Sequence, residues 1–234
     1  MTPARAPKPS PELTQPVEDY LKAIYELETL GAAAETNAIA DMLRIAPASV
    51  SGMVRRLAEQ GLITHERYHG ARLTSAGRKA ALRTLRRHRV IEAYLTSALG
   101  YSWDRVHDEA ERLEHAASDE LIDRMAAAIG EPETDPHGAP IPARDGTLEE
   151  RDSVPLLTLH PGEAAKVERV SDKDGDRLRY LAELGIIPGA TVHLIAREPF
   201  GGPIALRVGP ASRTIGPELA AQIYVAPAGR RPRR

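Results

Sequence analysis

The chain of 234 residues contains no cysteine. This absence excludes disulfides, thiolate metal sites and cysteine nucleophiles, and it is typical of proteins from a reducing compartment. Long hydrophobic runs are also missing, because neither the proline-rich opening segment nor any later stretch has the apolar length of a signal sequence or a membrane span. We therefore expect a soluble, cytoplasmic protein that does not associate with a membrane.

A strong net charge is absent as well, since 31 Lys and Arg oppose 33 Asp and Glu for a formal charge of −2. The two signs are nevertheless segregated along the chain. Basic residues gather at 55–56, 67–72 and 78–89, whereas acidic residues dominate 104–123 and 145–152. Such asymmetry fits DNA contact at one end of the fold and cation capture elsewhere, although two ordinary solvated surfaces would give the same pattern.

The first third of the chain carries the pattern of a small DNA-binding domain. Residues 17–31 have the apolar spacing of a helix, and a second short helix is expected from about residue 36. Pro47 suits the first turn of a third helix, which Gly61 ends. Residues 62–74 follow as a strand, a turn and a returning strand. Three helices and a hairpin predict a winged helix-turn-helix.

The third of these helices offers small polar residues near its start and arginines further along. Small side chains let a helix backbone approach the major groove, and arginines reach phosphates. A helix in any three-helix domain, with its arginines merely solvated, is the alternative, and the basic hairpin tips the balance toward DNA. The predicted DNA-binding residues are Pro47, Ala48, Ser49, Ser51, Gly52, Arg55, Arg56, Arg67, His69 and Arg72.

The remaining chain reads as helices followed by a β segment. Ser75 can cap a long helix that runs to about Gly100, and Ser102 can cap another that runs to about Ile129. Repeated Gly and Pro in residues 130–142 predict a linker that leads away from the helices. Past residue 151, short apolar runs separated by Gly and Pro predict a small all-β barrel of the SH3-like kind.

The predicted fold class is therefore mainly α with a small β domain. A flexible arm is expected at 1–15, a winged helix-turn-helix at 16–76 and a helical domain at 77–145. A linker at 146–153, an SH3-like barrel at 154–226 and a basic tail at 227–234 complete the chain.

The segment 107–115 carries the chemistry that points to a metal. Four of its ligand-type side chains lie at offsets of four, three and one, so these four share one face of a helix that borders the core. Carboxylates partly removed from water are costly unless a cation or hydrogen-bond donors compensate. The preceding helix holds two more such residues, four apart, which could complete a second cluster. The six residues are His107, Glu111, Glu114, His115, His88 and Glu92.

Imidazole and carboxylate without sulfur suit Mn(II), Fe(II), Co(II) or Zn(II), and the excess of oxygen ligands leans toward Mn(II). Taken alone, His88 with Glu92 is explained as well by an ordinary helical ion pair. Glu111 with His115 could likewise be a surface pair. A di-metal helical metalloenzyme and a metal-independent DNA-binding protein therefore stay open as alternatives to a metal-activated regulator.

Taken together, these residues resemble the diphtheria toxin repressor family, which includes iron-dependent regulators and manganese transport regulators. The resemblance covers about residues 17–225, and its most specific parts are 17–27, 49–51, 73–77, 87–89, 106–109 and 114–118. It implies a transcriptional regulator that represses metal uptake and homeostasis genes, and not an enzyme. Residues 77–145 would build a homodimer that binds a pseudo-palindromic site in double-stranded DNA, activated by Mn(II) or Fe(II) and in vitro by other divalent metals.

The resemblance also implies how the ligands divide. A principal site would contain Asp19, which the spacing could not find, together with Glu111, Glu114 and His115. An ancillary site would contain His88, Glu92 and His107. The iron branch has sulfur-bearing side chains where this chain has Asp19 and Glu111, so the ligand set is similar to that of the manganese branch. That branch has a carboxylate one turn after Asp19, where this chain has Lys22.

The β segment resembles the iron-transport accessory domain through residues 176–189. In the family this module can lend oxygen ligands to the ancillary site. Asp172, Asp174 and Asp176 are the nearest candidates, although a solvated acidic loop would explain any one of them.

Overall fold

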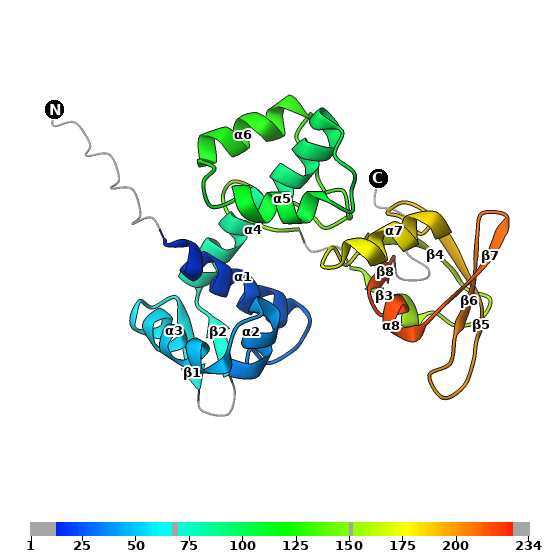
Figure 1. Ribbon diagram of the computed structural model, residues 1–234, viewed down its shortest axis with the longest axis horizontal. Coiled ribbons are helices and arrows are strands. Elements are labelled where there is room, and N and C mark those ends of the chain that lie inside the picture. The colour runs from blue at the N-terminus through cyan, green and yellow to red at the C-terminus, as the bar shows by residue number, and fades with distance from the viewer. Residues whose placement is uncertain (1–12, 67–69, 150–151, 227–234) are drawn as a thin grey trace. The chain divides into compact units, whose positions relative to one another are not determined.

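The computed structural model describes residues 13–66, 70–149 and 152–226, and it divides into two compact units, residues 1–85 and 86–234 (Figure 1). Two of the predicted DNA-binding residues, Arg67 and His69, lie outside the described residues.

The first unit is a three-helix domain with a two-stranded wing. Its elements are α1 (Gln15–Thr29), α2 (Thr36–Leu43), α3 (Pro47–Glu59), β1 (Ile63–Glu66) and β2 (Gly70–Leu73), with the two strands antiparallel. α3 begins at Pro47 and buries Val50, Val54 and Leu57, whose spacing of four and three places them on one face. The predicted winged helix-turn-helix is confirmed.

The inner end of the wing is tied to both flanking helices. Glu28, in the last turn of α1, accepts a hydrogen bond from the backbone N–H of Leu73 at 2.8 Å. Its other carboxylate oxygen accepts from Arg78 at 2.6 Å, and the Arg78 guanidinium lies over the ring of Tyr25. Thr74 caps α4 (Ser75–Leu99), because its hydroxyl accepts from the Gly77 N–H, so the cap lies one residue before the predicted Ser75.

Glu28→Ala is expected to loosen this junction. The substitution removes the acceptor for Leu73 and the partner of Arg78, and we expect it to lower the free energy of unfolding by about 1 to 3 kcal/mol, because hydrogen bonds to a carboxylate are charge-assisted. Urea denaturation measures the change. Glu59→Ala is the matched control, since Glu59 faces Arg55 at 3.9 Å with both side chains exposed. Equal losses of unfolding free energy in the two variants would contradict a stabilising role for Glu28 at this junction.

The second unit begins with the remainder of α4 and continues as α5 (Val106–Leu113) and α6 (Asp119–Ala128). Val90, Ile91 and Leu95 of α4 share a buried core with apolar residues of α5 and α6. The single helix predicted from Ser102 to Ile129 is wrong, because a turn separates α5 from α6. The Ser118 hydroxyl accepts a hydrogen bond from the Leu121 N–H and so starts a new helix.

The predicted linker at 130–142 does not lead away from the helices. Arg86 donates to the carbonyl of Pro142 at 2.9 Å and Arg89 donates to that of Pro140 at 2.5 Å, so two arginines of α4 hold this loop. The carboxylate of Asp135 accepts hydrogen bonds from the N–H groups of His137 and Ala139, which closes a buried turn. Proline and glycine break regular structure here without exposing the chain.

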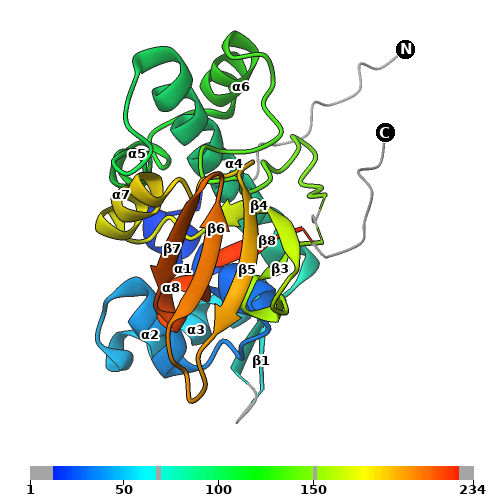
Figure 2. The same ribbon diagram turned by 90° about the vertical axis from the view of Figure 1, so that its right-hand side faces the viewer.

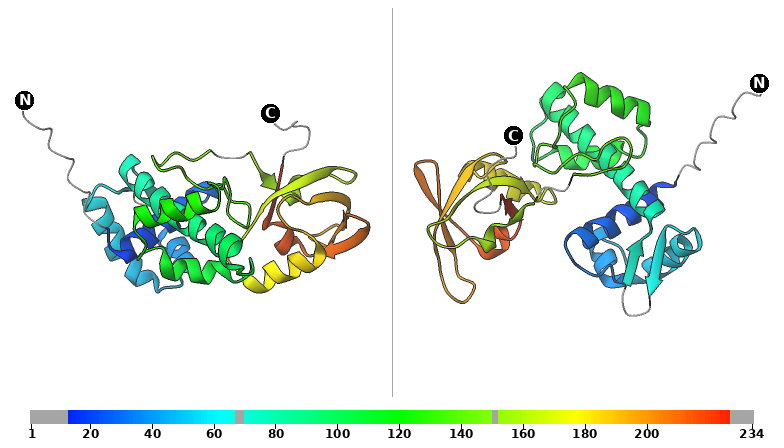
Figure 3. Two further views of the ribbon diagram at one scale, coloured as in Figure 1. Left: turned by 90° about the horizontal axis from the view of Figure 1, so that it is seen from above. Right: turned by 180° about the vertical axis from the view of Figure 1, so that it is seen from behind.

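The C-terminal part of the second unit is a six-stranded antiparallel sheet with the order β3-β8-β4-β5-β6-β7 (Figures 2 and 3). Its elements are β3 (Val154–Pro155), the 3-10 helix η1 (Leu156–Thr158), β4 (Ala164–Val170), α7 (Gly175–Leu184), β5 (Thr191–Arg197), β6 (Ile204–Val208), β7 (Ala211–Ile215), α8 (Pro217–Ala220) and β8 (Ile223–Val225). The prediction of an SH3-like module is confirmed, but an all-β composition is wrong. Leu178 and Leu181 of α7 are buried in the sheet's core.

Candidate metal centre

Two neighbouring turns of α4 supply the first pair of ligands. His88 and Glu92 are four residues apart, and His88 Nε2 lies 3.1 Å from Glu92 Oε1. Both side chains are buried, and Glu92 is not exposed at all. A carboxylate in such a place needs a compensating cation, a proton or hydrogen-bond donors.

The predicted ancillary residues come together around Glu92. From α5, His107 places Nδ1 3.5 Å from Glu92 Oε1, and the His107 ring meets the His88 ring edge-on at 5.0 Å. Asp172, which follows β4, approaches the same imidazole nitrogen at 3.7 Å. Ligand atoms of His88, Glu92, His107 and Asp172 all lie within 4.8 Å of one another, a spacing that one divalent ion could bridge.

The other two acidic candidates point elsewhere. Asp174 caps α7 by accepting from the N–H groups of Asp176 and Arg177, and Asp176 pairs with Arg179. Of the three neighbouring acids that the sequence offered as candidates, Asp172 is therefore the one that contacts the cluster.

Sequence reasoning missed a further pair of ligand-type residues in the loop after α6. Asp135 and His137 are both buried beside Glu92, and His137 Nδ1 lies 3.7 Å from Glu92 Oε2. With Glu92 they form a second group whose ligand atoms lie within 4.8 Å of one another. No helical spacing could reveal them; the one available signal was the Asp-Pro-His-Gly run at 135–138.

Four buried atoms of this cluster have no hydrogen-bond partner among the described residues: Glu92 Oε2, His107 Nδ1, Asp135 Oδ2 and His137 Nδ1. Buried polar atoms are nearly always satisfied, since each unsatisfied one costs about 1 to 3 kcal/mol. All four are imidazole nitrogens or carboxylate oxygens, which are the donors that Mn(II), Fe(II) and Zn(II) accept. The donor set therefore fits a divalent cation.

Burial and neighbouring charges shift the pKa values of the cluster's side chains. Burial raises the pKa of Glu92, but His88, His107 and His137 outweigh burial and hold it well below its usual range. Burial lowers the pKa of His137, yet its contacts with Glu92 and Asp135 raise it to about 9. Burial and the nearby Glu92 raise the pKa of Asp135 to about 6. Glu92 and His137 thus stabilise each other's charged forms.

The residues predicted for the principal site lie next to this cluster. Glu114 is fully buried at the C-terminal end of α5, and its Oε2 lies 2.5 Å from His88 Nδ1. Glu111 Oε1 lies 3.5 Å from the same nitrogen, and His115 Nε2 lies 3.4 Å from Glu114 Oε1. The structure thus brings Glu111, Glu114 and His115 together with His88. Asp19 lies on α1, in the first unit.

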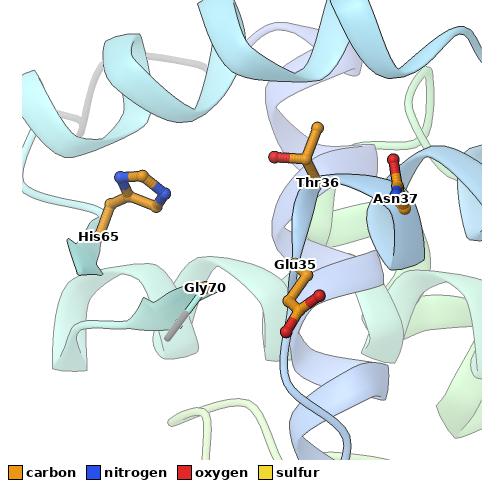
Figure 4. Close-up of a pocket in the computed structure, with 5 residues that line it drawn as sticks. All are labelled: Glu35, Thr36, Asn37, His65 and Gly70. Carbon is orange, nitrogen blue, oxygen red and sulfur yellow. The ribbon is translucent and has the colours of Figure 1, made fainter. Parts of the chain in front are cut away.

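The predicted DNA-reading side chains lie on the exposed face of α3. Pro47, Ala48, Ser49, Ser51, Gly52, Arg55 and Arg56 are exposed, and so is Arg72 on the wing. A small polar hollow lies between the start of α2 and the wing. Its lining residues are Glu35, Thr36, Asn37, His65 and Gly70, and Figure 4 shows His65 and Gly70 of the wing on one side with Glu35, Thr36 and Asn37 on the other.

Some of the basic residues form ion pairs within the protein and are not available to contact DNA. Arg86 pairs with Asp123, and Arg87 pairs with Asp119, each at 3.0 Å. The cluster of arginines at 78–89 therefore balances acidic residues of α6 as well as the loop after it.

Comparison with known proteins matches three family models along the chain. The N-terminal DNA-binding domain of iron-dependent repressors matches residues 12–71, and their metal-binding and dimerisation domain matches 74–143. The FeoA domain matches 154–227. The diphtheria toxin repressor of Corynebacterium jeikeium is 32% identical over 80% of this chain and 88% of its own length. The chain belongs to the diphtheria toxin repressor family.

Further members of the family are similar to this protein over almost the whole chain. The iron-dependent repressor IdeR of Mycobacterium leprae is 31% identical over 92% of this chain and 98% of its own length. A manganese-dependent transcriptional repressor in complex with manganese is 39% identical, with a TM-score of 0.86 over 90% of this chain and 99% of that chain. IdeR of T. acidophilum reaches a TM-score of 0.77 at 31% identity over 89% of this chain and 96% of that chain.

Membership decides between the alternatives that the sequence left open. This is a family of iron- and manganese-dependent transcriptional repressors, so the protein is a metal-dependent DNA-binding regulator and the metalloenzyme alternative is excluded. Among the described residues, none of the helices is long and apolar enough to cross a membrane.

Proposed function

We propose that this protein is a cytoplasmic repressor that binds Mn(II) or Fe(II) and controls genes for metal uptake and homeostasis. The observation that carries the proposal is the cluster of buried carboxylates and imidazoles around Glu92, four of whose ligand atoms lack a hydrogen-bond partner among the described residues, in a chain that also has an exposed helix-turn-helix face. The proposed domains are the DNA-binding domain (16–76), the helical domain (77–145), a linker (146–153) and the SH3-like domain (154–226). The predicted tail (227–234) and most of the predicted arm (1–15) lie outside the described residues.

We assign the ligands to two proposed sites. The principal site consists of Asp19, Glu111, Glu114 and His115. The ancillary site is centred on Glu92, and its other proposed ligands are His88, His107 and Asp172. Asp135 and His137 lie beside the second carboxylate oxygen of Glu92 and are further candidate ligands. Asp174 and Asp176 are not needed, because they already bond α7 and Arg179.

The donor set favours Mn(II) over Fe(II) only modestly. Carboxylate oxygens dominate the principal site, which suits a hard ion such as Mn(II). Lys22 follows Asp19 by three residues and so shares its face of α1, where a positive charge opposes a second cation. We therefore propose a single ion in the principal site.

The coupling to DNA follows from where the ligands lie in the sequence. Asp19 belongs to the helix that begins the DNA-binding domain, whereas Glu111, Glu114 and His115 belong to the helical domain. An ion held by both domains favours the conformers in which the two domains have a fixed relative orientation. It shifts the population only by its higher affinity for those conformers. In a two-fold dimer this fixes the spacing of two recognition helices on a pseudo-palindromic operator.

The helical domain supplies a surface for that dimer. Three large apolar side chains are exposed on it at the end of α4, the end of α5 and the first turn of α6, and we propose that they contribute to the subunit interface. They are Leu99, Leu113 and Leu121.

Operator binding under anaerobic conditions tests the proposed function. Mn(II), Fe(II) and Zn(II) are titrated separately while binding to the promoter of the protein's own gene or of a metal importer is measured. We expect each activating ion to raise operator affinity and a chelator to remove the gain. Equal affinity with ion and with chelator would overturn the proposal in favour of a metal-independent DNA-binding protein.

Arg56→Ala is expected to weaken DNA binding without changing sequence preference. An exposed arginine on α3 contacts phosphates in this proposal, so its loss weakens binding almost uniformly across sequences and lowers the slope of log affinity against log salt by about 1. Fluorescence anisotropy at several salt concentrations measures both. Arg124→Ala is the control, since Arg124 pairs with Glu120 on the surface of α6. An unchanged salt slope would argue against a phosphate contact.

A further inference from the structure

The turn between α4 and α5 is in contact with the SH3-like domain. Trp103 in this turn packs against the core of that domain, and its ring is stacked with the His137 ring at 5.8 Å between centroids. His137 Nε2 also lies 2.7 Å from the Trp103 carbonyl oxygen, within hydrogen-bond distance. A tryptophan of the helical part thus completes the apolar core of the β part.

The next residue of the turn holds the start of α7. Asp104, whose side chain is only 10% exposed, accepts a hydrogen bond from Arg179 of α7 at 3.0 Å. Gly175, the first residue of α7, approaches the same turn so closely that an added Cβ would lie 2.6 Å from the Asp104 carbonyl oxygen. A charge-assisted hydrogen bond and a close backbone approach therefore coincide at the start of α7.

The loop after α6 holds the end of β4. The N–H of Val170, the last residue of β4, donates to the His137 carbonyl at 3.0 Å. Gly138 has a φ of +90°, and an added Cβ would lie 1.9 Å from the Glu168 carbonyl oxygen. Arg86 and Arg89 of α4 hold this loop from its other side. The contact is therefore continuous from α4 through the loop to β4.

Asp172 lies between these two points. It follows Val170 by two residues and precedes Gly175 by three, so the short segment that carries it is fixed at both ends by contacts with the helical domain. These contacts consist of hydrogen bonds, an ion pair and apolar packing. They need no metal.

We propose that these contacts hold the SH3-like domain on the helical domain in the metal-free protein, with Asp104 and Arg179 as positioning residues for Asp172. The inference rests on the proposed function only in making Asp172 a ligand. Its consequence is that the ancillary site exists before the ion arrives, so binding does not have to order a free domain. The ion then adds to a docked state instead of creating it.

The only tryptophan of the chain reports docking directly. In full-length protein with a chelator, we expect Trp103 to emit at the wavelength of a partly buried indole, and addition of Mn(II) to leave that wavelength unchanged. Emission typical of a solvated indole in the metal-free protein, with a blue shift on adding Mn(II), would overturn the proposal, because docking would then depend on the metal.

A pair of variants on α7 tests the positioning role. Arg179→Ala removes the partner of Asp104, and we expect the Val170 amide to exchange its hydrogen roughly 3- to 10-fold faster in the metal-free protein, since charge-assisted hydrogen bonds lose strength with exposure. Arg177→Ala is the matched control on the same helix, because Arg177 pairs with Asp174 inside its own domain. Equal exchange rates in the two variants would overturn the positioning role.

The affinity for Mn(II) separates this inference from the proposed function. If Arg179→Ala loosens docking, weaker binding of the ancillary ion should accompany faster exchange, and Arg179→Lys should restore part of both. If the wild-type protein is docked but binds no Mn(II), the proposed function fails and the docking still stands. If it binds Mn(II) with the domain undocked, the docking fails and the proposed function still stands.

Discussion

Glu114→Gln is expected to abolish the metal response of operator binding. Glu114 is fully buried, lies 2.5 Å from His88 and contacts His115, so its carboxylate connects the two proposed sites. The amide keeps the shape of the side chain and removes the charge that a cation needs. Changes to residues behind a metal ligand cost about 10- to 100-fold in affinity, so loss of a ligand charge is expected to cost at least about 100-fold.

Mn(II) affinity and operator affinity are both measured for this variant, with and without a chelator. Glu109→Gln is the matched control, because Glu109 lies on the same helix and pairs with Arg112 at the surface. Operator binding without metal should be unchanged in both variants. A Glu114→Gln protein that still responds fully to Mn(II) would show that Glu114 is not a ligand.

The sequence predicted best where a pattern is local. Pro47 at the start of α3 and the apolar spacing behind it depend on residues within one helix, and the predicted and observed bounds nearly coincide. The pair His88 and Glu92 follows the same rule, because residues four apart on a helix are neighbours wherever the helix lies.

The prediction failed where a local signal competes with a longer pattern. The helical periodicity of 102–129 continues through Ser118, yet the serine cap ends one helix and begins another. The break matters for function, because Glu114 is the residue at the end of α5 and His115 lies in the turn beyond it. An unbroken helix would have continued through both residues and kept their side chains at helical spacing.

Contacts between distant segments were beyond sequence reasoning. Asp135 and His137 reach Glu92 only because Arg86 and Arg89 hold their loop on α4, about 50 residues away in sequence. Asp172 joins His107 only because β4 and α7 are fixed on the helical domain. Composition and periodicity carry no information on such pairings, and neither could distinguish Asp172 from Asp174.

Two glycine-to-alanine changes in the first unit are expected to shift stability in opposite directions. Gly77 lies in the first turn of α4, where an added Cβ would lie 1.9 Å from the Leu62 carbonyl oxygen. Backbone atoms cannot rotate away as a side chain can, so α4 would have to move from the wing. We expect Gly77→Ala to lower the free energy of unfolding by about 3 kcal/mol, at the upper end of overpacking costs.

Gly52→Ala is its matched partner. Gly52 lies in the middle of α3, where an added Cβ would meet nothing within 4 Å, and alanine is the better helix former by about 0.5 to 1 kcal/mol. Urea denaturation should therefore show Gly52→Ala to be more stable than the wild type, while operator affinity falls if the bare backbone at this position approaches the bases. Destabilisation by both variants would mean that alanine is not tolerated in either helix. A gain in stability with undiminished operator affinity would mean that Gly52 lies outside the DNA contact.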